Sequence, residues 1–233
     1  MSRVDLNIDL GELADEPEEL YALATVVNIA CGGHAGDADS MARSVDRAIR
    51  AGARIAAHPS YPDRASFGRA PMPMPARLLY EAIVEQTDAL AHLVRQAGTR
   101  LWGAKMHGAL YHASADDAEI ASAVLDAIVA VWPDGVTIVG PSWGRLEKES
   151  RARGLAYARE GFADRRYGPD GKLVSRESPD ALLETPEACA AQAVTLAQTG
   201  AVATLCVHGD HPNSVAIARA VRRALEDEGL LSR

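Results

Sequence analysis

Histidines, carboxylates and a lysine stand where short apolar runs of this chain end. The run Val202–Val207, for example, ends directly in His208, and Asp210 follows two residues later. Four of the seven histidines occupy such positions: His34, His58, His107 and His208. Other polar residues lie within these runs or soon after them: Asn7, Asp9, Glu12, Lys105, Asp164, Arg165 and Asp210. This set of side chains suits general acid–base chemistry on water, with or without a metal ion.

Several of these polar residues also have a purely structural interpretation. Asp210 could be the N-cap of a helix after the last strand, and Asp37 the N-cap of an earlier helix. Lys105 could form a buried salt bridge with carboxylates of the first strand, or it could stabilise an oxyanion or a phosphate. Asp63 and Arg64 could pair within one loop. The functional interpretation gains weight only if the whole set converges at one place.

The elements that must position these residues are predicted from hydrophobic patterning. Short apolar runs predict strands at Val4–Leu10, Val26–Cys31, Arg54–Ala57, Leu101–Met106, Val136–Val139, Leu155–Ala158 and Val202–Val207. Helical periodicity marks Met41–Ala51, Arg77–Ala97, Ala118–Val131, Pro186–Gln198 and Val215–Glu228. Alternating strands and helices predict a parallel sheet covered by helices, in which all strands end on one rim. Such rims bind ligands in barrels and in open α/β sheets.

The first strand is unusually polar for a central strand of such a sheet. Asp5, Asn7 and Asp9 alternate along it and therefore share one face. Lys105 and His107 are likewise two residues apart and share a face if that strand continues. A closed barrel with a polar interior explains this pattern better than an open sheet. We therefore predict an α/β fold, a seven-stranded parallel β/α barrel, in a single domain spanning residues 1–233.

Composition and charge exclude several classes of function. The chain has 233 residues, of which 48% are apolar and 24% charged, as in ordinary soluble globular proteins. Its formal net charge of −8 argues against general binding to nucleic acid or to anionic membranes. Charges also stand where a signal peptide would need its apolar core, so we expect a cytoplasmic protein. The three cysteines, Cys31, Cys189 and Cys206, form no CxxC pair, and Cys31 and Cys206 are expected to be buried.

Familiar nucleotide and hydrolase motifs are absent from the sequence. It contains no GxxxxGK[ST] loop and no GxGxxG after a strand. It also contains no HExxH and no GxSxG, so nucleophilic serine catalysis is not indicated.

Six segments, taken in order, resemble the LamB/YcsF family, whose members are also called the A subunit of 5-oxoprolinase. They are DLNIDLGE, NIACGGHAGD, HPSYPDRASFGR, KMHGALYH, GFADRRYGPDGKLVSR and CVHGD. The resemblance implies a barrel of the glycoside hydrolase/deacetylase type. It also implies ATP-dependent hydrolysis of the lactam 5-oxo-L-proline to L-glutamate, in a complex with subunits B and C. The sequence departs from the family at Gly33, Met106 and His112, where an aromatic residue, a proline and an asparagine are usual, and these departures bear on the substrate.

The implied reaction needs a base, an acid and a cationic clamp for phosphate. We expect Asp9 or His58 as the base, and His107 or His208 as the acid. Lys105 with Arg165 would form the clamp. The full catalytic set is Asp9, Glu12, His58, Lys105, His107 and His208, and the binding set is Asn7, His34, Asp164, Arg165 and Asp210.

Two other functions remain open at this point. Related deacetylase-type barrels bind a divalent ion, and Asp9, His34 and His58 could supply such a site here. The chain would then be a metal-dependent hydrolase of an amide or sugar that acts alone. Alternatively it would be a non-catalytic subunit that binds the lactam while its partners use ATP. The sequence does not decide whether ATP contacts this chain or whether it forms a homo-oligomer.

Overall fold

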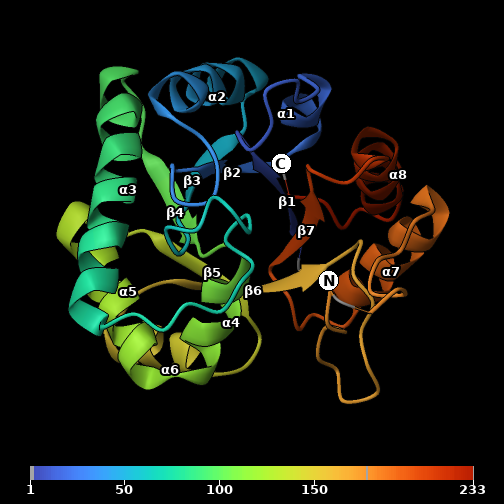
Figure 1. Ribbon diagram of the computed structural model, residues 1–233. Coiled ribbons are helices and arrows are strands. Elements are labelled where there is room, and N and C mark those ends of the chain that lie inside the picture. Colours follow the sequence, from blue (N-terminus) through green and yellow to red (C-terminus); the bar gives the residue numbers. More distant parts are fainter. Residues whose placement is uncertain (1–2, 177, 233) are drawn as a thin grey trace.

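The sheet of this protein is a closed parallel barrel (Figure 1). The computed structural model describes residues 3–176 and 178–232. Each strand pairs with its neighbour in chain order, and the last strand pairs with the first. The strands are β1 Asp5–Leu10, β2 Val26–Ala30, β3 Arg54–His58, β4 Leu101–Lys105, β5 Thr137–Pro141, β6 Tyr157–Phe162 and β7 Thr204–His208. The predicted seven-stranded β/α barrel is confirmed.

Helices surround the barrel on its outside (Figure 1). Those in the described ranges are α1 Glu19–Leu23, α2 Ala38–Ala51, α3 Ala76–Gln96, α4 Gly108–Asp116, α5 Ala118–Val131, α6 Arg145–Ala152, α7 Pro186–Gln198 and α8 Ser214–Asp227. The five predicted helices correspond to α2, α3, α5, α7 and α8. The prediction missed α1, α4 and α6, which have only 5, 9 and 8 residues and therefore offer few turns of periodic pattern.

The alternation in β1 separates the helix-facing side of the barrel from its interior. Leu6, Ile8 and Leu10 are fully buried in the hydrophobic core beneath the helices. Asn7 and Asp9 are also buried, but they point inward and hydrogen-bond to residues of other strands. The polar barrel interior expected from the sequence is therefore present.

The strand β6 differs most from its prediction. The expected run ended at Ala158, whereas the strand continues through Glu160 to Phe162. Glu160 is only 4% exposed, so it is not part of a solvated loop. The exposed Arg159 and the buried Glu160 interrupt the apolar run, and this interruption shortened the predicted strand.

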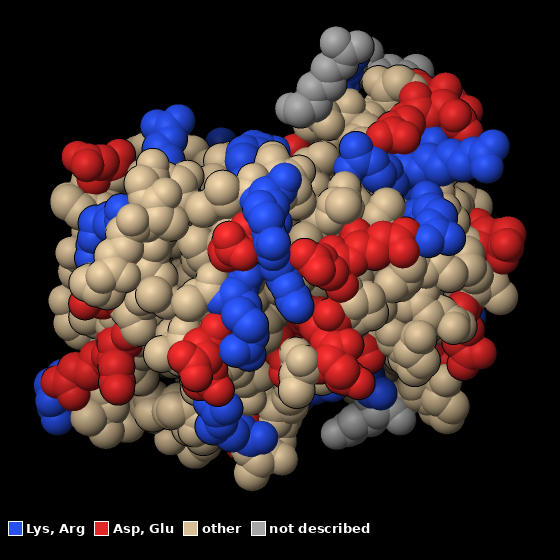
Figure 2. All heavy atoms as spheres, turned by 90° about the horizontal axis from the view of Figure 1, so that it is seen from above, with Lys and Arg blue, Asp and Glu red and all other residues tan. Residues whose placement is uncertain are grey.

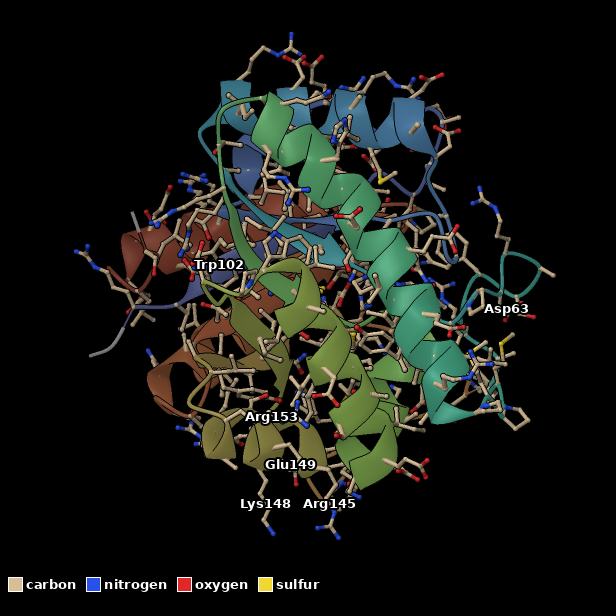
Figure 3. The ribbon with its side chains drawn as sticks, turned by 90° about the vertical axis from the view of Figure 1, so that its left-hand side faces the viewer. Asp63, Trp102, Arg145, Lys148, Glu149 and Arg153 are labelled. Atoms are coloured by element: carbon tan, nitrogen blue, oxygen red, sulfur yellow. The ribbon has the colours of Figure 1, made fainter. Side chains whose placement is uncertain are left out.

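Local polar interactions fix two loops near the barrel rim. Asp37 caps α2 in a reciprocal capping box with Ser40, as predicted. The predicted pairing of Asp63 with Arg64 is wrong, because Asp63 accepts from the backbone N–H of Ser66 and Arg64 donates to backbone carbonyls. Figure 3 shows Asp63 on a loop that projects away from the barrel.

Surface charge, helix character and cysteine burial can be compared with the expectations drawn from composition. Figure 2 shows basic and acidic side chains interspersed on the face it displays, without a broad basic patch. Within the described ranges, no helix combines the length and the apolar character that crossing a membrane requires. Cys31, Cys189 and Cys206 are free and buried, which confirms the expectation for Cys31 and Cys206.

Candidate active site

A cavity of about 510 Å³ opens among the loops that follow the strands. Five of the predicted catalytic residues line it: Asp9, His58, Lys105, His107 and His208. A neighbouring cavity of about 530 Å³ is mainly apolar, with Trp143, Phe162 and Leu196 in its walls. None of the predicted site residues lines that second cavity. The candidate site therefore lies in the first cavity, at the rim where the sequence placed it.

A buried lysine stands between two carboxylates at the centre of the barrel. Nζ of Lys105 lies 2.9 Å from Oδ1 of Asp9 and 3.0 Å from Oε1 of Glu160. Burial alone would lower the pKa of Lys105, but the opposite charges, with Asp9 foremost, hold that pKa well above its usual value. Burial alone would raise the pKa of Asp9, but the charges of His58 and Lys105 hold it well below its usual value. Of the two roles that the sequence allowed for Lys105, the structure shows the buried salt bridge.

Other barrel residues complete this polar centre. Nδ2 of Asn28 donates to Oδ1 of Asn7 at 2.7 Å and to Oδ1 of Asp9 at 2.8 Å. Nδ2 of Asn7 donates to Oε1 of Glu160 at 3.0 Å. Sγ of Cys206 lies 3.0 Å from Nζ of Lys105. Asn28, Glu160 and Cys206 were not predicted as site residues, although inward alternation along their strands could have identified them.

Two histidines beside this centre have fixed tautomers. Nδ1 of His58 donates to the carbonyl oxygen of Lys105 at 2.8 Å. Nε2 of His107 donates to the carbonyl oxygen of Phe67 at 2.9 Å. Phe67 has a φ of 54°, uncommon for a residue with a side chain, and this conformation accompanies the contact. In the neutral histidines, Nε2 of His58 and Nδ1 of His107 therefore carry lone pairs, and these two atoms lie 3.0 Å apart.

His34 and Glu12 complete a group that we call the histidine cluster: Glu12, His34, His58 and His107. The ring of His34 stacks on that of His107, with centroids 3.6 Å apart and planes 2° apart. Nε2 of His34 lies 3.0 Å from Oε1 of Glu12. Burial, followed by the charge of His58, lowers the pKa of His34 to about 2 and that of His107 well below its usual value. Burial, followed by the charge of Asp9, raises the pKa of Glu12 well above its usual value.

His208, which lines the cavity, forms a separate pair with the buried Asp164. Nδ1 of His208 lies 2.9 Å from Oδ2 of Asp164, which also accepts from the backbone N–H of His208 at 2.8 Å. Burial alone would raise the pKa of the fully buried Asp164, but the charge and hydrogen bonds of His208 lower it. Because Nδ1 is engaged by Asp164, Nε2 is the ring nitrogen that remains for proton transfer.

Three arginines line the same cavity. Arg165 is 4% exposed, and its Nη2 donates to the carbonyl oxygen of Val174 at 2.7 Å. Its Nε is buried and has no hydrogen-bond partner within the described part of the chain. Burial, followed by repulsion from Arg176, lowers the pKa of Arg165 to about 10. Arg69 instead forms an ion pair with Asp210.

That ion pair corrects the structural interpretation of Asp210. The last helix, α8, has Asn213 at its N-cap, so Asp210 is not the cap. Arg176 was not predicted, because it lies in the loop between β6 and α7 and no strand end marks its position.

The structure regroups the residues proposed as metal ligands. Asp9 is held by Lys105 and Asn28. A carboxylate oxygen of Asp9 lies within 4.8 Å of potential ligand atoms of Cys206 and His208, and His34 is not part of this group. The ligand atoms that lie within 4.8 Å of one another belong to Glu12, His34, His58 and His107. This group shares His34 and His58 with the set Asp9, His34 and His58, and Asp9 lies beside it, with its Oδ2 3.4 Å from Nε2 of His58.

The departure at Gly33 has a steric explanation. A Cβ at this position would lie 2.3 Å from Oε1 of Gln86 and 2.5 Å from Oγ of Ser60. Gln86 accepts from the backbone N–H of Ser60 at 3.0 Å and donates to its carbonyl oxygen at 2.9 Å. The amide of Gln86 thus occupies the space beside Gly33 that a larger side chain would need. Of the other departures, Met106 is fully buried and His112 lines the cavity.

Comparisons with known proteins agree with this architecture. The model of the LamB/YcsF family matches residues 4–233. A protein from Methylococcus capsulatus that is named as the A subunit of 5-oxoprolinase is 43% identical over 244 residues, covering 97% of this chain and 94% of that protein. The crystal structure of the lactam utilization protein from Thermus thermophilus superposes with a TM-score of 0.91 at 33% identity, covering 99% of each chain.

A more distant match concerns the fold alone. The catalytic domain of a peptidoglycan N-acetylglucosamine deacetylase from Eubacterium rectale has a TM-score of 0.55 at 12% identity, covering 99% of this chain and 88% of that one. This likeness confirms the deacetylase-type barrel. The family match and the 43% identical relative go further, and they show that the chain belongs to the LamB/YcsF family.

Proposed function

We propose that this chain is the A subunit of an ATP-dependent 5-oxoprolinase, which hydrolyses 5-oxo-L-proline to L-glutamate together with subunits B and C. The name of the Methylococcus relative, an A subunit of 5-oxoprolinase, supports the substrate and the existence of partner subunits. The observation that carries a catalytic role is the pair His208–Asp164 at a cavity of about 510 Å³. A purely scaffolding protein would have no need of a histidine oriented by a buried carboxylate.

The chemistry defines what the cavity must supply. A lactam amide resists hydrolysis because it is stabilised by resonance and its amine is a poor leaving group. Transfer of a phosphoryl group from ATP to the lactam oxygen makes the carbonyl carbon electrophilic. Water then adds to that carbon, the C–N bond breaks as the ring nitrogen takes a proton, and a second water releases phosphate. The site therefore needs one group that moves protons and a cationic group for phosphate or carboxylate.

His208 is the residue best placed to move the protons. Asp164 holds its Nδ1–H, so Nε2 can take a proton from water and return it to the ring nitrogen. The alternative base Asp9 is a weak one, because its pKa is held well below the usual value. His58 and His107 point their free nitrogens at each other rather than at a shared substrate position. We therefore assign both proton transfers to His208.

The anion clamp is best assigned to two arginines. Lys105 was a candidate, but its ammonium group is already bound by Asp9 and Glu160. Arg165 keeps an unpaired, buried Nε and Arg176 lines the same cavity. Two neighbouring guanidinium groups can hold a carboxylate or a phosphoryl group through charge-assisted hydrogen bonds. The revised clamp is Arg165 with Arg176, and Lys105 instead fixes Asp9 and Glu160.

The test is release of glutamate from 5-oxoproline and ATP, by the chain alone and by the complex assembled with subunits B and C. We expect activity only in the complex. His208→Gln should lower turnover by about 10²–10⁴-fold without preventing assembly, as loss of a general acid–base group does. His92→Gln, at an exposed position on α3, is the matched control. An active complex that tolerates His208→Gln would instead identify a non-catalytic role for this chain, and an assembled complex without activity would refute the assignment.

One observation favours a second candidate function. The histidine cluster gathers donor atoms of the kind that hold a catalytic metal. On this basis the chain would be a metal-dependent hydrolase of an amide or an acetylated sugar that acts alone. Activity without partners, abolished by a chelator, would distinguish it from the first proposal.

A further inference from the structure

The histidine cluster lies outside the proton-transfer pair and the arginine clamp. Oε1 of Glu12 lies 3.0 Å from Nε2 of His34, 3.4 Å from Nδ1 of His107 and 3.8 Å from Nε2 of His58. Nε2 of His58 lies 3.0 Å from Nδ1 of His107. All four side chains are nearly inaccessible, with side-chain exposures of 0–5%. Four atoms that could each serve as a metal ligand thus lie close together, away from bulk water.

When both rings are neutral, the tautomers of His58 and His107 leave two lone pairs facing each other. Backbone carbonyls accept the N–H groups of His58 and His107, so the two nitrogens that meet at 3.0 Å are both acceptors in the neutral rings. Two acceptors at hydrogen-bond distance repel each other unless a proton or a metal ion lies between them. A backbone carbonyl on the outer ring nitrogen is also the support that metal-binding histidines usually have.

The spacing of the donor atoms fits a small divalent ion. Zinc binds histidine nitrogen at about 2.0–2.1 Å, so the ligands of a tetrahedral site stand roughly 3.3–3.4 Å apart. The pair distances given above, 3.0, 3.4 and 3.8 Å, bracket that value. Nitrogen-rich sites favour zinc and its transition-metal neighbours over magnesium and calcium, which prefer oxygen ligands.

The barrel interior provides a comparison for this cluster. Asp9, Cys206 and His208 also form a group of potential ligands. There the ammonium group of Lys105 already contacts Asp9 at 2.9 Å and Cys206 at 3.0 Å, so a fixed cation is in place. In the histidine cluster no lysine or arginine of the described residues forms an ion pair with Glu12. The compensating charge there has to come from a proton or from a bound ion.

We infer that Glu12, His34, His58 and His107 bind one divalent transition-metal ion, with zinc as the best fit. His58 and His107 line the cavity, so an ion bound by them would lie beside it. When bound, it supplies a Lewis acid at the wall of the cavity that also holds His208. The inference concerns metal binding by the isolated chain and does not depend on which substrate the protein hydrolyses.

Direct binding to the chain alone tests this site. The protein is treated with EDTA, dialysed into metal-free buffer and titrated with ZnCl₂ by calorimetry, and its zinc content is measured after a second dialysis. We expect one equivalent of zinc in the wild type and in His92→Gln. Glu12→Gln and His107→Asn should weaken binding by about 100-fold or more, because loss of even a supporting residue costs 10–100-fold. Co²⁺ serves as a spectroscopic probe, whose visible absorption bands should report nitrogen-rich four-coordinate geometry.

Two results would overturn the inference. One is a wild-type chain that retains no zinc and gives no cobalt bands, in which case a proton shared by His58 and His107 fills the cluster. The other is zinc binding that is unchanged in both Glu12→Gln and His107→Asn. Thermal unfolding followed by circular dichroism shows whether each variant is folded. The wild-type titration decides the question even if a variant is not.

Discussion

Replacing Lys105 with methionine tests the charge balance inside the barrel. The methionine keeps most of the apolar stem but removes the ammonium group, leaving Asp9 and Glu160 buried without their shared cation. Removing one partner of a buried ion pair typically costs about 3–5 kcal/mol. Because domains of this kind have a free energy of unfolding of about 5–15 kcal/mol, the loss is a large fraction of the total. Denaturant unfolding at pH 7 measures it directly.

The control and the pH dependence sharpen this prediction. Lys148 on α6 is exposed and points away from the molecule (Figure 3), so Lys148→Met should change stability by less than about 0.5 kcal/mol. The folded-state pKa of Asp9 is depressed, so its stabilisation is present above the unfolded pKa of about 3.9 and is lost as the pH falls through the lower folded value. The difference between the wild type and Lys105→Met should therefore shrink below about pH 4.

A double variant tests whether the effect comes from the pair. Asp9→Asn removes one of the two negative charges, so in the Lys105→Met background it should cost less than it does in the wild type. If Lys105→Met unfolds within about 1 kcal/mol of the wild type at pH 7, the buried charges are not balanced as described. The same conclusion would follow if the two substitutions proved additive.

Three further substitutions probe the rim of the cavity. Gly33→Phe should lower the free energy of unfolding by about 1–3 kcal/mol or more through its clash with Gln86, and a combined Gln86→Ala change should recover part of that loss in thermal melts. Asp164→Asn should lower turnover of the complex by about 10³–10⁴-fold with little change in KM, since it alters the tautomer of His208; unchanged turnover would remove the dyad from the mechanism. Arg176→Met should raise the KM for the anionic substrate about 10–100-fold, the worth of one hydrogen bond to a charged group, and an unchanged KM for both lactam and ATP would refute the clamp.

The fold was largely predictable because polar and apolar residues alternate along β1, and this alternation indicates a polar face and an apolar face. Asp5, Asn7 and Asp9 share a face, and only a polar interior accommodates them. The same rule was harder to apply to β6, where the buried Glu160 directly follows the exposed Arg159 in a short strand. A carboxylate that is neutralised by Lys105 across the barrel cannot be distinguished in sequence from one in a solvated loop. The information lies in a partner 55 positions earlier in the chain.

The candidate site was predictable as a set but not as contacts. Strand ends indicated that His34, His58, His107 and His208 would meet at one rim. Which histidine faces which depends on backbone carbonyls such as that of Phe67, and sequence periodicity carries no information on these. Glu12 was expected among the catalytic residues. Its contacts with His34, His58 and His107 were not predicted, because they too depend on the tertiary structure. The role of Asp210 was ambiguous in the sequence. An aspartate just before a helix can cap that helix, or it can form an ion pair, as Asp210 does with Arg69.

The three buried cysteines can report local or global unfolding of the chain, because they become reactive only when they are exposed. Burial raises the pKa of Cys31 and of Cys189 to about 12, and burial, followed by the charge of Asp9, raises that of Cys206 well above its usual value. Since the thiolate is the reactive form, alkylating reagents and oxidants should leave the closed barrel unmodified. The rate at which these thiols are labelled then measures how often the protein opens. A thiol-specific reagent can therefore follow the opening kinetics without any engineered residue.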